Sequence, residues 1–255
     1  MQYDIRKPHS LENLYKIKIR VGDMTVKGVL FDKDGTLFEY GNTWQVWCER
    51  VIHEMTGDLL LQKALGDSCG FDIDSKTFTP GALVVNASAH EVNLVWAGIH
   101  PTLNYQAIEA IGLDKLKNLP VVPVCDLSEM LFSLKSMGMY VGCATNDFES
   151  SAEAQLSDAG LYDHFDFVCG FDSGFGAKPN PGMLEGFAKS CGIESSEVVM
   201  VGDSTHDLHC GRAAGAALCV GVLTGPAEVA DIQDHADVIL GTVELLPEYL
   251  KRVGL

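Results

Sequence analysis

GVLFDKDGTL, residues 28–37, is the stretch that decides the fold. It is a short apolar strand that ends in two carboxylates, Asp32 and Asp34, followed by a glycine and a threonine. Two nearby anions at a buried strand end repel each other and resist the loss of water. The pattern therefore indicates a hard divalent cation between the carboxylates, with a phosphate opposite. Mg²⁺ suits such a site because it takes few protein oxygens and keeps room for water and phosphate oxygens.

The same stretch contains candidate catalytic groups. Asp32 closes the strand, so the sheet holds it rigidly, and it is the candidate nucleophile for an aspartyl-phosphate. Asp34 lies in the following loop, from which it can give a proton to a leaving oxygen and later take one from water. Gly35 lets the backbone approach a phosphate, and Thr36 can donate a hydrogen bond. Taken alone, the stretch also fits an ordinary turn, since Asp and Gly are frequent turn residues.

Three later stretches favour the catalytic interpretation. Residues 140–147 (YVGCATND) and 198–207 (VVMVGDSTHD) are predicted strands that end in polar side chains. Residues 176–182 (GAKPNPG) place one lysine in a loop just before a helix. Ligands of open α/β sheets bind beyond the carboxyl ends of the strands. The stretches therefore predict a single rim that holds a nucleophile, phosphate-binding donors, a fixed cation and metal ligands.

Together these stretches resemble the four motifs of the haloacid dehalogenase superfamily of phosphotransferases. The resemblance covers residues 24–40 and 121–245, and residues 211–215 (GRAAG) resemble the helix after the fourth motif. The matching residues are Asp32 to Thr36, Thr145 with Asn146, Lys178 with Pro179, and Gly202-Asp203 through Asp207.

The resemblance implies a role for each matching residue. Asp32 would be the nucleophile and a metal ligand. Asp34 would be the acid/base and would offer its backbone carbonyl to the metal. Thr145 and Asn146 would hold the phosphoryl oxygens, beside the backbone at Gly35.

Three further residues complete the implied site. Lys178 would neutralise phosphoryl charge and orient Asp32, Asp203 would bind Mg²⁺, and Asp207 would support the site from nearby. Haloacid dehalogenases generally lack the second aspartate because halide leaves without a proton, whereas an alkoxide leaving group needs one. Asp34 therefore favours phosphate esters over carbon–halogen bonds.

We accordingly expect a Mg²⁺-dependent phosphatase that hydrolyses small phosphomonoesters of the phosphoglycolate type through an aspartyl-phosphate. A sugar phosphomutase is one alternative, because it forms the same intermediate and returns the phosphoryl group to its substrate. A non-catalytic phosphate-binding protein is another, but its expected mark is the loss of Asp32, Asp34, Lys178 or Asp203, and none is lost.

Bulk composition agrees with a cytoplasmic enzyme that acts on a small phosphorylated metabolite. The net charge of −17 argues against nucleic acid or an anionic membrane as a partner. No N-terminal signal peptide and no membrane-spanning apolar run are evident. The eight cysteines form no CxxC pair, so we expect them all to be reduced. His206, His209 and Cys210 contain metal-type ligands, but their helical spacing favours a structural role.

Strands that alternate with helices predict an α/β fold with a Rossmann-like parallel sheet. Residues 1–37 and 121–255 form the expected catalytic core, in which residues 16–31 make a hairpin. Helices are expected near residues 127–137 and 148–159, after Pro181, and from Asp207 towards Gly215.

Residues 38–120 are expected to be an inserted helical domain without strands, which resembles the type I cap of the superfamily. Its first helix is expected to begin at Asn42 or Thr43 and to end at Gly57, and a capping box opens another at Ser88.

Specificity is expected to depend on this cap. The candidates are the loop at residues 79–88 and Trp44, Trp47, Arg50 and His53, although packing or solvent exposure is the stronger explanation for each of these four side chains. The cap has few basic residues, which disfavours a heavily anionic leaving group.

Overall fold

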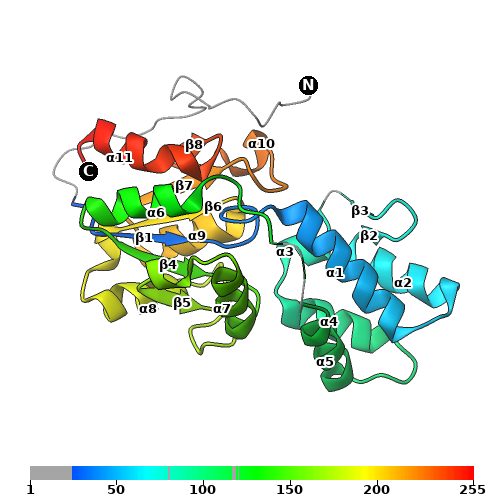
Figure 1. Cartoon of the computed structure of the whole chain (residues 1–255). Coiled ribbons are helices and arrows are strands. Elements are labelled where there is room, and N and C mark those ends of the chain that lie inside the picture. The colour runs from blue at the N-terminus through cyan, green and yellow to red at the C-terminus, as the bar shows by residue number, and fades with distance from the viewer. Residues whose placement is uncertain (1–24, 80, 117–118, 120) are drawn as a thin grey trace.

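The computed structural model describes residues 25–79, 81–116, 119 and 121–255. A six-stranded parallel sheet forms the centre, with helices on both faces and a separate group of helices beside it (Figure 1). The predicted α/β fold with a Rossmann-like parallel sheet is confirmed. The strands are β1 Gly28–Phe31, β4 Tyr140–Ala144, β5 Phe167–Cys169, β6 Val198–Gly202, β7 Leu218–Val222 and β8 Val238–Leu240.

The strand order of the sheet is β5-β4-β1-β6-β7-β8. The chain first builds outward from β1 through β4 and β5, and then returns to the other side of β1 with β6. This is the order 3-2-1-4-5-6 of doubly wound folds, whose ligand crevice lies where the direction of building reverses. The crevice is therefore expected between the carboxyl ends of β1 and β6.

The helices and short 3₁₀ helices of this unit connect the strands. They are α6 Leu127–Ser136, α7 Glu149–Asp158, α8 Gly182–Cys191, α9 Thr205–Ala214, α10 Val229–Ile232, α11 Leu246–Val253, η2 Tyr162–His164, η3 Ser195–Glu197 and η4 Val243–Leu245.

Alternate residues of β1 face opposite helical layers. Val29 and Phe31 lie in a hydrophobic core with residues of α6 and α11, whereas Leu30 packs in another with Phe187 of α8. All three side chains are fully buried. A strand buried on both faces is a nearly continuous apolar run, which explains why β1 could be identified from sequence.

Most of the predicted helices are present, with shifts of one to two residues at their ends. Helix α6 begins after Asp126, whose carboxylate accepts a hydrogen bond from the backbone N–H of Glu129. Helix α9 begins at Thr205 rather than at Asp207, because Ser204 and Asp207 form a capping box. This box fixes the Asp207 side chain in the first turn of the helix.

Figure 1 shows the second group of helices to one side of the sheet, between β1 and α6 in the chain. Its core contains three tryptophans, and the Trp47 and Trp96 rings stack 5.7 Å apart. The elements are α1 Tyr40–Met55, α2 Leu59–Cys69, β2 Phe71–Asp72, β3 Thr77–Phe78, α3 Leu83–Asn86, α4 Ala89–Ile99 and α5 Tyr105–Leu116. The exact division into core and cap at residues 37–38 and 120–121 stays a prediction.

Two predictions for this group are wrong and one is confirmed. Helix α1 begins at Tyr40 rather than at Asn42 or Thr43, and the Thr43 hydroxyl donates to the backbone oxygen of Glu39. The antiparallel pair of β2 and β3 interrupts a segment expected to be purely helical. Ser88 does form the predicted capping box, with Glu91.

The predicted hairpin over residues 16–31 is wrong for its second strand. β1 pairs in parallel with both β4 and β6, so neither of its edges is free for a hairpin partner. Residues 16–24 lie outside the described residues. Within the described ranges, none of the helices combines the length and apolar character that crossing a membrane requires.

Candidate active site

Neighbouring strand ends bring the predicted site residues to one edge of the sheet. Asp32 directly follows β1, Asp203 follows β6 and Thr145 follows β4. The backbone N–H of Asp32 donates to the carbonyl of Val201 at 2.8 Å, which joins the end of β1 to the end of β6. The two aspartates therefore occupy the crevice that the strand order predicts.

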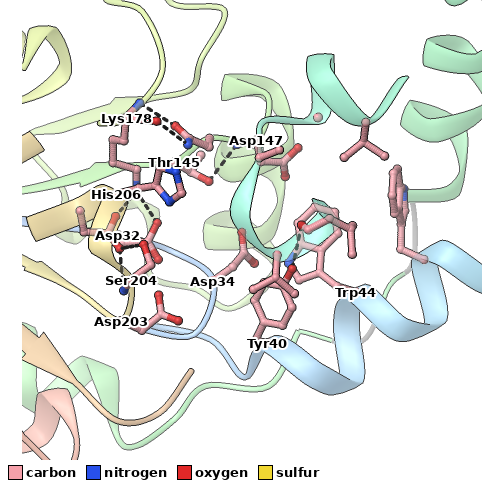
Figure 2. Close-up of a pocket in the computed structure, with 18 residues that line it drawn as sticks. Asp32, Asp34, Tyr40, Trp44, Thr145, Asp147, Lys178, Asp203, Ser204 and His206 are labelled. Atoms are coloured by element: carbon pink, nitrogen blue, oxygen red, sulfur yellow. Dashed lines mark hydrogen bonds and ion pairs between the residues drawn. The ribbon is translucent and has the colours of Figure 1, made fainter. Parts of the chain in front are cut away.

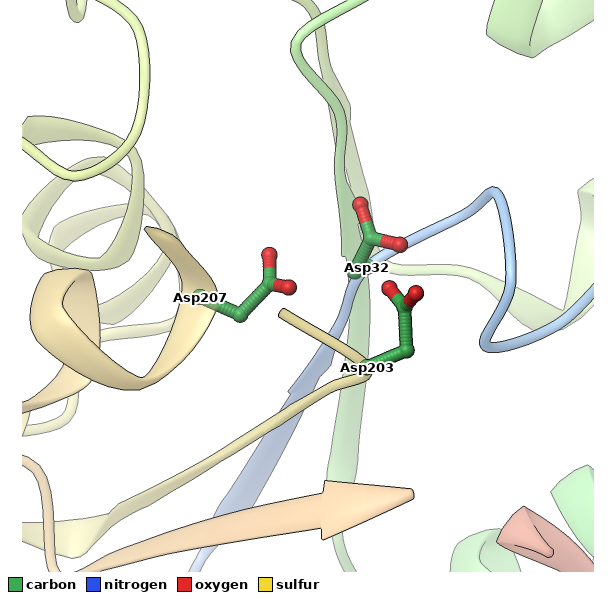
Figure 3. A group of neighbouring side chains, drawn as sticks. All are labelled: Asp32, Asp203 and Asp207. Atoms are coloured by element: carbon green, nitrogen blue, oxygen red, sulfur yellow. The ribbon is translucent and has the colours of Figure 1, made fainter. Parts of the chain in front are cut away.

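Asp32, Asp203 and Asp207 form a buried cluster of carboxylates (Figure 3). One oxygen from each lies within 4.8 Å of the others. Burial is the main cause that raises the pKa of Asp32 to about 7; Lys178 lowers this pKa, and Asp207 and Asp34 raise it. Burial, followed by repulsion from Asp32 and Asp207, raises the pKa of Asp203 well above its usual range. The cluster therefore carries more negative charge than its protein surroundings neutralise.

Lys178 is the cation at the centre of this cluster. Its ammonium lies 2.5 Å from Asp32 Oδ1 and 2.7 Å from Asp207 Oδ1, and it donates to the carbonyl of Ala144 at 2.8 Å. Burial lowers the pKa of Lys178, but the Asp207 and Asp32 carboxylates outweigh it and hold that pKa above its usual value. All three ammonium donors thus have partners, and Lys178 fixes one oxygen of Asp32.

The other oxygen of Asp207 is also occupied. Oδ2 accepts hydrogen bonds from the backbone N–H of Ser204 at 3.1 Å and from the Ser204 hydroxyl at 2.6 Å. Gly202 is required here, because a Cβ on it would lie 2.2 Å from Asp207 Cβ. With both oxygens engaged, Asp207 is suited to holding Lys178, which agrees with the supporting role predicted for it.

Asn146 positions Lys178 through two hydrogen bonds. Its side-chain oxygen accepts from the backbone N–H of Lys178 at 2.8 Å, and its Nδ2 donates to the Lys178 carbonyl at 3.0 Å. The predicted contact of Asn146 with phosphoryl oxygens stays a prediction. Thr145 is buried, and its hydroxyl oxygen accepts from the backbone N–H of Asp147, so its own hydrogen can point to a ligand.

Gly35 lies against Asp203 of the carboxylate cluster and is not among the residues that line the cavity. Its φ of 87° is accessible mainly to glycine, and a Cβ would lie 2.6 Å from Asp203 Oδ2. Its carbonyl accepts a hydrogen bond from Thr224 Oγ1 at 2.6 Å. The local structure supports a role in seating Asp203, and the predicted contact with substrate stays a prediction.

Asp34 pairs with a buried lysine that the sequence analysis did not identify. Lys33 has no exposed surface; its ammonium lies 2.9 Å from Asp34 Oδ2 and 3.4 Å from Asp147 Oδ2 and donates to Gln155 Oε1. Burial, the largest effect, lowers the pKa of Lys33, but Asp34 and Asp147 raise it above its usual value. A charged residue between two aspartates gives no sequence signal of such burial.

One cavity joins these groups. It encloses ≈ 700 Å³, part of it open to solvent, and is lined by Asp32, Asp34, Thr145, Asn146, Lys178, Asp203 and Asp207 among others. Figure 2 shows Asp32, Asp203, Lys178 and Thr145 on one side, Tyr40 and Trp44 on the other, and Asp34 between them.

The structure separates the weaker candidates. Trp44 and Trp47 line the cavity, as do Val84, Val85 and Ala87 from the predicted loop, but Arg50 and His53 do not. His206 also lines the cavity. The other two residues of its local sequence cluster lie elsewhere: His209 contacts His235, and Cys210 is buried in a hydrophobic core. All eight cysteines are free, as predicted.

The Lys33 network yields a stability prediction. Lys33→Met leaves Asp34 and Asp147 buried without their cation and should lower the free energy of unfolding by about 3–5 kcal/mol. Lys27→Met removes a half-exposed partner of Glu197 and should cost less than about 1 kcal/mol. Urea unfolding of both variants measures the difference, and equal losses would contradict the network.

Comparison with known proteins identifies the family. A family model for haloacid dehalogenase-like hydrolases matches residues 29–220. The "Probable phosphatase IndB" of Dickeya dadantii is 39% identical over 197 residues, which cover 77% of this chain and 81% of that protein. A phosphoglycolate phosphatase of Neisseria meningitidis is 38% identical over 122 residues, or 46% of this chain and 52% of the relative. This match thus spans only about half the length of that phosphoglycolate phosphatase.

Solved structures agree at the level of the fold. A phosphatase of this superfamily from Thermococcus onnurineus superimposes with a TM-score of 0.60 at 23% identity, covering 88% of this chain and 98% of that one. A β-phosphoglucomutase from Clostridium difficile gives a TM-score of 0.58 at 16% identity, covering 90% and 97%. On its family match, its strand order and its strand-end residues, this chain belongs to the haloacid dehalogenase-like hydrolase family.

Proposed function

We propose that the protein is a Mg²⁺-dependent phosphatase of small phosphomonoesters that works through an aspartyl-phosphate on Asp32. The observation that carries this proposal is the geometry around Asp32. Lys178 holds Oδ1 of Asp32 at 2.5 Å, which leaves Oδ2 for attack on phosphorus, while Asp203 supplies a second carboxylate beside it. Phosphoryl transfer depends mainly on positioning and on charge stabilisation, and these residues provide both.

The carboxylate cluster fits a divalent cation. Burial is the main cause that raises the pKa values of Asp32 and Asp203, and repulsion from neighbouring carboxylates raises them further against the opposing effect of Lys178. A hard cation would relieve this repulsion, and Mg²⁺ accepts carboxylate oxygens while keeping sites for phosphate. Asp32, Asp203 and the backbone carbonyl of Asp34 would hold it. When bound, Mg²⁺ would stabilise charge on the phosphoryl oxygens.

The protein residues then divide the reaction into two steps. Oδ2 of Asp32 attacks phosphorus, the bond from phosphorus to the ester oxygen breaks, and Asp34 gives that oxygen a proton. Asp34 next takes a proton from water, whose oxygen attacks phosphorus and releases phosphate from Asp32. Lys178 and Thr145 face the same region and would hold the phosphoryl oxygens during both steps.

We also infer that residues 38–120 act as a cap. Tyr40 and Trp44 of α1 and Val84 of α3 line the cavity opposite the carboxylates. The backbone N–H of Ala89 donates to the carbonyl of Asn146 at 3.5 Å, so the two units meet beside the phosphoryl-binding loop. A cap here would exclude bulk water and contact the leaving group.

The first test is phosphate release with Mg²⁺ from a panel that includes benzyl phosphate, 4-nitrophenyl phosphate and 2-phosphoglycolate. Asp32→Asn should lower the rate on the order of 10⁴-fold or more, because an amide is a poor nucleophile. Asp74→Asn, which changes an exposed carboxylate, should keep full activity. Release from none of the esters would favour the binding protein, and transfer to a sugar phosphate instead of water would favour the mutase.

Metal binding has a separate test in thermal unfolding. In chelator, Asp203→Asn should raise the melting temperature, because it removes one of the mutually repelling buried carboxylates. Mg²⁺ at about 100 times its Kd should raise the melting temperature of the unsubstituted protein by roughly 5–10 °C. Asp203→Asn should lose most of that gain, and an equal gain in both proteins would exclude Asp203 as a ligand.

The acid role of Asp34 predicts a dependence on the leaving group. Asp34→Asn should lower kcat/KM for benzyl phosphate by about 10²–10⁴-fold, because its alkoxide needs a proton. The loss for 4-nitrophenyl phosphate should be at least about tenfold smaller, since nitrophenolate leaves without one. The comparison uses kcat/KM because it reports the first phosphoryl transfer, and equal losses for both esters would remove the acid role.

A further inference from the structure

The half of the cavity opposite the carboxylates is aromatic and aliphatic. Figure 2 shows Tyr40 and Trp44 of α1 on this side. Val84 of α3, whose carbonyl accepts from the Tyr40 hydroxyl, and its neighbour Val85 also line the cavity, and we call these four residues the leaving-group wall. A phosphomonoester whose phosphorus lies next to Asp32 would direct its leaving group to this side. The chemistry of the wall therefore selects among leaving groups.

The leaving-group wall is held in place before any ligand binds. The Tyr40 hydroxyl donates to the carbonyl of Val84 at 2.9 Å, which joins α1 to α3. The Tyr40 ring also meets the Phe78 ring edge to face, with centroids 5.8 Å apart. A preformed aromatic surface of this kind favours a flat apolar group, because stacking adds to the area that is buried.

Charge in the cavity opposes an anionic leaving group. Five aspartates line it, and the one lysine among its described lining residues is Lys178. The Lys178 ammonium already contacts Asp32, Asp207 and a backbone carbonyl. His206 comes from α9, and Figure 2 shows it on the side of Lys178 and Thr145, away from Trp44. Lys33 lies 5.5 Å from the Trp44 ring centre, but it is fully buried and pairs with Asp34 and Asp147. A carboxylate on the leaving group would thus meet no unpaired cation at the wall.

Trp44 contributes its ring to the wall rather than a polar group. The residue is 8% exposed, and its Nε1 atom is itself buried. The wall therefore offers a ligand an aromatic surface at Trp44 and not a hydrogen-bond donor.

We propose that the preferred substrate is a phosphomonoester with an uncharged leaving group that has a flat apolar face. This inference rests on the phosphatase function proposed above and specifies its substrate class. It differs from the initial expectation of a phosphoglycolate-type substrate, whose leaving group carries a carboxylate.

The charge requirement is tested with two esters of the same size, 4-carbamoylbenzyl and 4-carboxybenzyl phosphate. The carbamoyl ester should have a kcat/KM about 10-fold to 100-fold higher, because a carboxylate would be desolvated without a partner. Benzyl phosphate should also be preferred to 2-phosphoglycolate. Val85→Lys places an ammonium at the wall and should narrow the ratio between the two matched esters.

The aromatic requirement is tested with Trp44→Leu, which keeps an apolar side chain and removes the ring. This variant should raise the KM of benzyl phosphate about threefold to tenfold, because stacking on the ring is lost.

The outcomes separate this inference from the proposed function. Asp32-dependent hydrolysis with 2-phosphoglycolate or 4-carboxybenzyl phosphate as the better substrate overturns the inference and leaves the phosphatase function intact. An unchanged KM for benzyl phosphate in Trp44→Leu overturns the role of the Trp44 ring. Absence of Asp32-dependent release from every ester, 4-nitrophenyl phosphate included, overturns the phosphatase function and the inference with it.

Discussion

The proximity of the Asp32 and Asp203 carboxylates is the constraint on which the rest of the site depends. Two adjacent parallel strands, β1 and β6, end in buried aspartates, and neither carboxylate reaches water freely. Such a pair is tolerated only where cations offset it. Lys178 provides one positive charge, and the Asn146 side chain and Asp207 hold that lysine from two sides. The remaining deficit of positive charge supports the proposed metal ion, whose charge would also be needed for a phosphate to approach these carboxylates.

A second buried cation connects the acid/base loop to the cap. The Lys33 ammonium pairs with Asp34 and Asp147 and lies 5.5 Å from the centre of the Trp44 ring. Attraction between an ammonium and an aromatic face is strengthened where water is excluded. Lys33 therefore links the residue proposed to protonate the leaving oxygen with the residue proposed to contact the leaving group. A shift of α1 would move the Trp44 ring and, through its contact with Lys33, change the surroundings of Asp34.

The sequence predicted the parts of the site that depend on strand ends. Asp32, Thr145 and Asp203 were identifiable because each follows an apolar run, and parallel strands bring such positions to one edge. The environment of Lys33 was not predictable, because its burial depends on Asp147 and Gln155, more than 100 residues away in the chain. The three-residue strand β8 and the β2–β3 pair were missed because runs so short show no clear periodicity.

The residues proposed for phosphoryl transfer and those proposed for substrate choice lie on different parts of this chain. A relative can therefore share the first group without sharing the second. The residues proposed for chemistry follow strands of the sheet, whose geometry the whole family shares. The leaving-group wall comes from Tyr40 and Trp44 on α1 and from the short helix α3. The helical spacing of these residues would be the same if they only packed against neighbouring helices. The interpretation of the wall depends on facts absent from any pattern: the hydrogen bond that joins Tyr40 to Val84, and the absence of a free cation among the described residues that line the wall. Similarity to phosphoglycolate phosphatases over about half their length thus supports a common reaction, whereas the choice of leaving group follows from the wall itself.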